Sequence, residues 1–435
     1  MPLRKYLRSW VYKINQKKGE DLIMATIKPF VCVRPNAQAA DKVAALPYDV
    51  YNREEACEAV KGNDLSFLRI DRAETQFEPS VDIYDERVYA KAKELLDGMI
   101  EDGTFITDTD ECYYIYELTM DGRTQTGLVA CASIDDYANN VIKKHENTRA
   151  DKEADRIHHV DTCDAQTGPI FLAYRANDII RSVMEEVKKE QALYSFTSDD
   201  GIRHQVWKIG KTEDIAAIRS EFEKTDSIYI ADGHHRAASA VKVGFKRREE
   251  HPDYNGDEEF NFFLSVLFAD EELMIMPYNR VVKDLNGHSP VEFLDLIGKS
   301  FVVEKLGSEP YAPTEKGVVG MYLNEEWYKL TAKEEIRSDD PVDGLDVSLL
   351  QNNLLSPVLG IGDPRVDKRI DFIGGIRGLK ELERRCSLDM TVAFSMYPTS
   401  IQELFAVSDA GLLMPPKSTW FEPKLRSGLF IHKLS

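Results

Sequence analysis

The feature that most constrains this chain is a short hydrophobic run that leads into a polar turn and an alanine-rich segment. Residues 228–231 predict a buried strand, Asp232 and Gly233 a turn, and residues 237–244 a helix that stops at Gly244. Such a unit directs backbone N–H groups and the positive end of a helix dipole at the space before the turn, where glycine permits close approach. The pattern predicts an anion site, suited to phosphate, on an α/β (α+β) fold.

The turn also carries a dense set of polar side chains. Asp232 could bind a metal ion or accept a proton, and His234, His235 and Arg236 follow it directly. The alternative is that Asp232 only caps the helix while the histidines are solvated. The whole five-residue run after a hydrophobic strand favours the functional interpretation.

Composition limits the classes of protein that this chain can belong to. With 435 residues the chain is long enough for two or three domains, and 75 acidic against 55 basic residues give a net charge of −20. This charge argues against nucleic acid or an anionic membrane as the main partner. The six cysteines include no Cys-x-x-Cys pair, and no apolar run is long enough to span a membrane. We therefore expect a cytoplasmic protein with reduced thiols.

The order of helical and strand patterns predicts four regions. A hairpin is expected around Asp121-Gly122, and two further buried strands, at residues 260–269 and 273–282, are expected to pair as a second hairpin. The predicted regions are an N-terminal extension (1–23), an N-terminal α/β domain (24–134), a core with an insertion (135–289) and a C-terminal α/β region that completes the site (290–435).

A second polar cluster spans residues 141–156. Asn147 or Thr148 can cap a helix that places Arg149, Lys152 and Arg156 on one face, with Glu146 just before it. A solvated, salt-bridged helix is the alternative for these charges. Asp49, in a loop stiffened by Pro47, is a second-rank candidate for the site together with Arg149 and Lys152.

A third cluster lies near the C-terminus, where prolines flank a loop at residues 413–425. The loop offers Lys417, Ser418, Thr419 and Lys424, which suit a phosphate or carboxylate, although a purely structural proline-rich loop is the alternative. Arg280 lies in one of the apolar predicted strands, where it needs an anion or a carboxylate; a structural ion pair is equally compatible.

Together these clusters identify a family resemblance. The segments 46–50, 144–148, 231–236 and 414–424 are similar to those of a widespread prokaryotic family of about this length that has no agreed function, and the resemblance covers Met24 to the C-terminus. A more distant resemblance is to free L-serine kinases of the ParB/sulfiredoxin-like fold. The residues that match the kinase motifs, in chain order, are Lys143, His145 and Glu146; Asp232, Gly233, His234, His235 and Arg236; and Pro416, Lys417, Ser418 and Thr419.

The second resemblance implies a ParB/sulfiredoxin-like phosphate-binding core and a role for each motif. Glu146 would take the proton of a serine hydroxyl, and the Asp232 turn would hold donor phosphates with Mg²⁺ near Asp232. The remaining expected roles are catalysis for His234; phosphate or nucleotide binding for Gly233, His235, Arg236 and Arg280; and substrate binding for His145, Lys417, Ser418, Thr419 and Lys424. The interval between Glu146 and Asp232 is longer than in the kinases, which implies an inserted subdomain.

The resulting expectation is a Mg²⁺-dependent phosphotransferase that acts on a small hydroxyl metabolite, with free L-serine and O-phospho-L-serine as the leading substrate pair. The donor stays open among ADP, ATP and pyrophosphate. Two alternatives also stay open. One is a nucleotide-binding regulatory or partner-binding protein of ParB-like fold, and the other is a phosphatase or nucleotide hydrolase that uses the same site.

Overall fold

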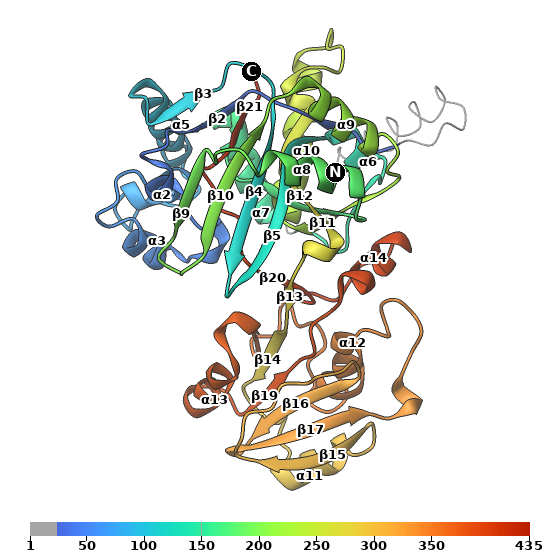
Figure 1. Cartoon of the computed structure of the whole chain (residues 1–435). Helices are drawn as coiled ribbons and strands as arrows, with labels where there is room; N and C mark the ends of the chain where they lie inside the picture. Colours follow the sequence, from blue (N-terminus) through green and yellow to red (C-terminus); the bar gives the residue numbers. More distant parts are fainter. Residues whose placement is uncertain (1–23, 149) are drawn as a thin grey trace.

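The computed structural model describes residues 24–148 and 150–435, which form two lobes (Figure 1). The first lobe contains a nine-stranded sheet and the second a six-stranded sheet, with helices packed on both. The predicted α/β (α+β) class is confirmed. The predicted extension (1–23) and Arg149 lie outside the described residues.

The large sheet is mixed, with parallel pairs beside antiparallel ones. Its strands, in spatial order, are β6 (Ile142–Lys143), β11 (Ile228–Asp232), β8 (Ile170–Tyr174), β12 (Phe262–Ala269), β5 (Arg123–Ser133), β4 (Tyr113–Met120), β10 (Arg203–Ile209) and β9 (Tyr194–Thr197), and β1 (Ile27–Lys28) pairs with β5. The predicted hairpin is confirmed as β4 and β5, whose turn residues Asp121 and Gly122 have φ angles of 51° and 78°. Positive φ at both positions matches the twist of paired strands.

Alternating residues of the sheet strands divide the core of the first lobe into two. Tyr113 and Ile115 face helices α8 (Asp178–Val187), α9 (Thr212–Phe222) and α10 (His234–Glu250), whereas Tyr114 and Tyr116 face the returning C-terminal segment. The first lobe also contains α2 (Ala40–Val43), α3 (Arg53–Ala59), α4 (Leu68–Asp71), α5 (Glu86–Glu101), α6 (Ile134–Ala138) and α7 (Ala150–Cys163).

The second lobe is built on an antiparallel sheet. Its strands, in spatial order, are β15 (Phe301–Gly307), β17 (Glu326–Ala332), β16 (Val318–Leu323), β19 (Val392–Ser395), β14 (Tyr278–Val282) and β18 (Ile370–Gly374). Its helices are α11 (Pro290–Ile297), α12 (Asp346–Leu350) and α13 (Leu379–Leu388).

The chain returns from the second lobe to the first before it ends. Helix α14 (Ile401–Asp409) lies at the junction, and β20 (Trp420–Phe421) pairs with β13 (Ile275–Met276) as the chain passes back (Figure 1). Strand β21 (Ile431–Lys433) then joins a four-stranded sheet with β2 (Cys32–Pro35), β3 (Phe105–Thr107) and β7 (Ala165–Gln166). This return carries the third polar cluster past the first lobe.

Two local predictions are wrong. Helix α10 begins at His234 and continues through Gly244 to Glu250. Gly244 does not end the helix; it is a packing position, where the close approach of Phe260 and Ile134 leaves no room for a Cβ. The strands predicted as a second hairpin, β12 and β14, belong to different sheets because the chain crosses between the lobes after β12. The domain boundaries at 134 and 289 stay predictions; strands from both sides of residue 134 pair in the large sheet.

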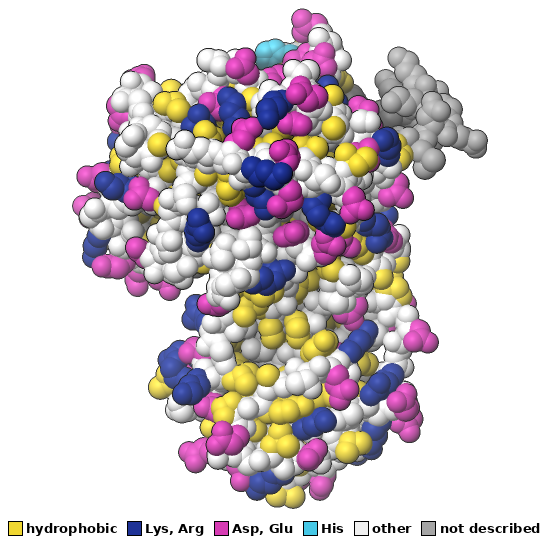
Figure 2. Space-filling model, in the orientation of Figure 1, with side chains coloured by type: hydrophobic (Ala, Val, Ile, Leu, Met, Phe, Trp, Pro, Cys, Tyr) yellow, Lys and Arg dark blue, Asp and Glu magenta, His cyan; other side chains and the backbone are white. Residues whose placement is uncertain are grey.

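The surface distributes charged and hydrophobic side chains differently over the two lobes (Figure 2). On the face drawn in Figure 2, basic and acidic side chains are interspersed over the first lobe, and hydrophobic side chains gather on the second lobe below the junction. Among the described residues, no helix combines the length and the apolarity that crossing a membrane requires.

Candidate functional site

The first two polar clusters meet because two parallel strands end side by side. Strand β11 pairs in parallel with β6, with Tyr229 opposite Lys143, so Asp232 and the residues after Lys143 emerge at the same edge of the sheet. Ligand sites of α/β proteins characteristically lie at such carboxyl ends. The pairing therefore places His145 and Glu146 next to the Asp232 turn.

The turn itself is held in a conformation that requires glycine. Gly233 has a φ of 93° and is the N-cap residue of α10. A Cβ at this position would also lie 3.3 Å from Nε of Arg236, whose side chain folds back over the turn and donates from Nη1 to the Pro169 carbonyl at 2.7 Å. Asp232 accepts from the Gly233 N–H at 2.7 Å and makes no cap to the N2 or N3 amide. The start of α10 thus presents its positive dipole end beside Asp232.

Asp232 is paired with a lysine from the third cluster. Lys424 Nζ lies 2.9 Å from Asp232 Oδ2, and it also lies over the Trp420 ring at 4.8 Å from the centroid. Although burial opposes its ionisation, the charges of Lys424 and Arg236 hold the pKa of Asp232 well below its usual range. Asp232 is therefore a permanently ionised carboxylate at neutral pH.

Glu146 and Lys417 form the more open part of the site. Both residues are solvent-exposed. Desolvation by the surrounding protein raises the pKa of Glu146, and Lys417 opposes this effect while Asp232 adds to it. The pKa of Lys417 is raised despite desolvation, because Tyr278, Glu146 and Asp232 favour the ammonium form. A carboxylate with a raised pKa thus lies within the electrostatic influence of a cation, and in its ionised form it can accept a proton.

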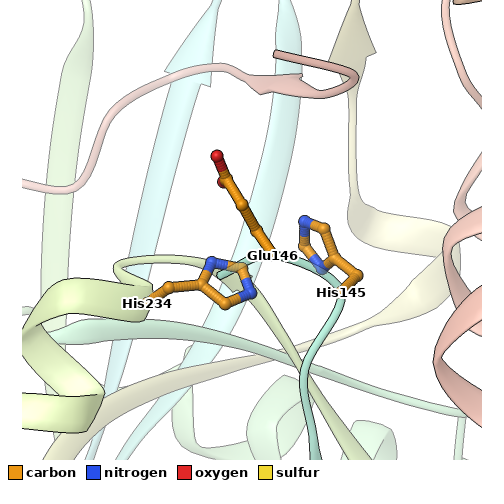
Figure 3. Close-up of side chains that lie close together, drawn as sticks. All are labelled: His145, Glu146 and His234. Carbon is orange, nitrogen blue, oxygen red and sulfur yellow. The ribbon is translucent and has the colours of Figure 1, made fainter. Parts of the chain in front are cut away.

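Two buried histidines lie beneath Glu146. The rings of His145 and His234 meet edge to face with centroids 4.4 Å apart, and Figure 3 shows the Glu146 side chain extending past them. Burial lowers the pKa of His145 to about 4, against the opposing charge of Asp232. Burial and the His145 ring lower the pKa of His234 well below its usual range. Both rings are therefore neutral at pH 7.

The third cluster is held in place by contacts from three directions. Met414 N–H donates to the His145 carbonyl at 2.8 Å, which fixes the loop to the first lobe. From the second lobe, the buried Arg280 donates from Nη2 to the Lys417 carbonyl at 3.0 Å, and no described acidic side chain pairs with it. The Ser418 hydroxyl donates to the Pro415 carbonyl at 2.6 Å. Arg280 and Ser418 therefore shape the loop that presents Lys417 and Thr419.

Not every predicted residue lies at this site. Asp49 is close enough to Lys424 to raise the pKa of its ammonium, although less than Asp232 does. Lys152 instead lines a small cavity of about 20 Å³ between α5 and α7, together with Arg156 and His159.

The sequence patterns assigned no role to two aromatic side chains at the site or to a cavity behind it. Trp420 lies beneath Lys424, and Tyr278 lies 5.5 Å from the Lys417 ammonium. Behind Arg236, a cavity of about 30 Å³, large enough for a water molecule, is lined by polar groups that include Tyr48, Asp71, Arg156, His159 and Thr167. These residues reach the turn only through tertiary packing and through the return of the chain from the second lobe to the first.

Comparison with known proteins places the chain in a family. The fold and site define a mixed α/β protein with a polar site at the carboxyl ends of parallel strands. Residues 27–348 match the family described as "Protein of unknown function (DUF1015)", and the chain belongs to that family. A search of curated proteins finds no match.

Several solved structures are similar to this chain at low identity. A free serine kinase in complex with AMP has 14% identity and a TM-score of 0.32, over 69% of this chain and 91% of the kinase. SbnI from Staphylococcus aureus, with a C-terminal truncation, has 10% identity and a TM-score of 0.37, over 68% and 85%. A conserved hypothetical protein from Pyrococcus furiosus has 14% identity and a TM-score of 0.34, over 69% and 94%.

Proposed function

We propose that this protein is a phosphotransferase that acts on a small hydroxyl metabolite, with free L-serine and O-phospho-L-serine as the substrate pair. The observation that carries the proposal is the convergence of Glu146, Lys417 and the Asp232–Lys424 pair at the start of α10. Phosphoryl transfer depends mainly on positioning and on the stabilisation of charge, and this site combines a proton acceptor with several cations and a helix N-terminus.

In the proposed reaction, the serine hydroxyl oxygen bonds to the terminal phosphorus of the donor while the bond from phosphorus to the leaving oxygen breaks. Glu146 takes the hydroxyl proton, since its raised pKa suits a general base. Arg236, Lys417 and the amides of the turn face the charge on the transferred group. Ser418, Thr419 and Lys424 belong to the loop that borders the substrate, and ADP, ATP or pyrophosphate is the donor.

Asp232 is the residue that fits Mg²⁺ best. Magnesium prefers oxygen ligands and keeps several of its waters, and Asp232 is an ionised carboxylate with lone pairs beyond the two used by Lys424 and Gly233. Bound Mg²⁺ would neutralise charge on the donor phosphates. The residues at the turn would then hold those phosphates in place.

The direct test is to monitor phosphate exchange by ³¹P NMR. The purified protein is incubated with Mg²⁺, L-serine or O-phospho-L-serine, and each donor or acceptor in turn. We expect phosphoserine from one donor, and we expect Glu146→Gln to lower its rate by roughly 10²–10⁴-fold while nucleotide binding is kept.

The matched control is Glu249→Gln, on the exposed far end of α10, which should keep the wild-type rate. Equal rates in Glu146→Gln and wild type would remove Glu146 from the mechanism. Release of inorganic phosphate without phosphoserine would identify a hydrolase instead, and binding without turnover of any donor would identify a nucleotide-binding protein.

A further inference from the structure

Each of the two buried imidazoles beneath Glu146 has a nitrogen without a hydrogen-bond partner. His145 is 2% exposed and His234 is 7% exposed. Nδ1 of His145 and Nε2 of His234 are buried, and neither forms a hydrogen bond within the described part of the chain. Leaving a buried polar atom unpaired costs about 1–3 kcal/mol. Two such atoms in adjacent rings indicate that this place binds a further group.

The arrangement of these side chains suits a metal ion. One ligand atom from each of His145, Glu146 and His234 lies within 4.8 Å of the other two. A metal at about 2.0–2.2 Å from nitrogen and oxygen ligands sets those ligands roughly 3–3.5 Å apart. The histidines are fixed by burial, whereas Glu146 is solvent-exposed and extends past them (Figure 3). A rotamer change of Glu146 can therefore close the remaining distance.

The charges around the cluster are compatible with a cation. Imidazole binds a metal through the lone pair of an unprotonated ring nitrogen, and each ring offers a buried nitrogen without a hydrogen-bond partner in the described part of the chain. Glu146 and the nearby Asp232 supply negative charge, while Lys144 and Lys417 lie close enough to oppose it. The two carboxylates therefore offset only part of the positive charge that a divalent ion and these two lysines bring together.

We propose that His145, Glu146 and His234 bind a divalent transition-metal ion of the class of Zn²⁺. Two imidazoles and one carboxylate are a ligand set that such ions prefer, and three protein ligands leave a position open for water or substrate. Magnesium, in contrast, prefers oxygen ligands, so this site is distinct from Mg²⁺ at Asp232. The proposal does not require the phosphotransferase activity, and one Glu146 oxygen can bind the metal while the other accepts a proton.

The test uses the full chain, stripped of metal by a chelator and titrated with Co²⁺ or Zn²⁺ alone. Bound Co²⁺ is followed by its visible absorption and Zn²⁺ by calorimetry, with no nucleotide or serine present. We expect one equivalent to bind. His145→Gln and His234→Gln should each weaken binding by at least roughly 100-fold, because losing a direct ligand should cost at least as much as losing a partner that only orients a ligand. His158→Gln changes an exposed histidine of α7 and should bind as the wild type does.

Two outcomes would overturn the metal site. One is Co²⁺ binding in His234→Gln that equals the wild type. The other is the absence of stoichiometric binding by the wild type. X-ray absorption of the Zn²⁺-loaded wild type needs no variant to fold, and it should show two imidazoles in the coordination shell; a shell of oxygen alone would also refute the site. The protein could fail these metal-binding tests and still exchange phosphate between substrates in the presence of Mg²⁺. That result would leave the proposed function intact.

Discussion

At the scale of single residues, the site depends on an ion pair whose partners are far apart in the sequence. Asp232 and Lys424 are separated by 192 positions, and their side chains meet at 2.9 Å. The sequence indicated each residue separately, because each lies in a polar cluster of its own. It could not indicate that they pair, since the pairing depends on the return of the chain from the second lobe.

A double-mutant cycle tests this pair. Asp232→Asn and Lys424→Met should each destabilise the fold, since each leaves the partner charge partly buried and unpaired. The double variant should be more stable than the sum of the two losses implies, with a coupling energy of about 0.5–3 kcal/mol from urea unfolding. Additive losses would show that the pair contributes nothing beyond its separate members.

The pH dependence of turnover tests the electrostatic influence of Lys417 on Glu146. If Glu146 is the base, as proposed, it must be ionised to work, so the rate of phosphate exchange should rise with pH through its raised pKa. Lys417 lowers that pKa, so Lys417→Met should move the acid limb of kcat to higher pH, whatever it does to the maximum rate. Lys380→Met, on an exposed face of α13, is the control and should leave the limb in place. A limb that stays fixed in Lys417→Met, or moves to lower pH, would contradict this influence.

At the scale of elements, the strand–turn–helix unit was the part of the site that the sequence predicted best. The hydrophobic run of β11 and the glycine at the turn are local signals, and both are confirmed. Periodicity did not predict where His145 and Glu146 lie, because β6 is only two residues long. Only the resemblance to the kinases implied that they share a site with the Asp232 turn. Its pairing with β11, which brings the two clusters together, is a tertiary contact.

The end of α10 was mispredicted because Gly244 serves packing in the helix interior. A Cβ at Gly244 would lie 2.4 Å from the Phe260 carbonyl oxygen, so Gly244→Ala should destabilise the protein by about 1–3 kcal/mol. Gly98 of α5 has open space around it, and Gly98→Ala should be about 0.5–1 kcal/mol more stable than the wild type. Urea unfolding measures both variants, and an equal effect of the two substitutions would contradict the close approach at Gly244.

At the scale of the whole molecule, the site needs both lobes. Arg280 from the second lobe holds the Lys417 carbonyl, while Asp232 and Glu146 come from the first. The largest hydrophobic cluster contains residues of both sheets, such as Val129 and Met321, so the core is continuous across the junction. The sequence predicted β12 and β14 as buried strands but assigned them to one hairpin, because nothing local marks the crossing between them.

Helix α14 is the contact that should fix the lobes to each other. Phe405 is buried and stacks on Tyr229 with ring centroids 3.8 Å apart, and Asp409 accepts from Tyr229 and Arg175 at 2.9 Å each. Phe405→Ala should lower the free energy of unfolding by roughly 3–5 kcal/mol. Because it removes a contact between the lobes, it should also separate the calorimetric transition into two and speed proteolysis at residues 270–277.

The control for this prediction is Phe293→Ala, which removes an equally buried ring from α11 within the second lobe. It should cost a similar free energy of unfolding, since the lost burial is similar. It should not speed cleavage at the crossing, because the contact between α14 and β11 is kept. If proteolysis at residues 270–277 is equally fast in both variants, the cleavage rate depends on global stability alone. Helix α14 would then have no separate role in joining the lobes.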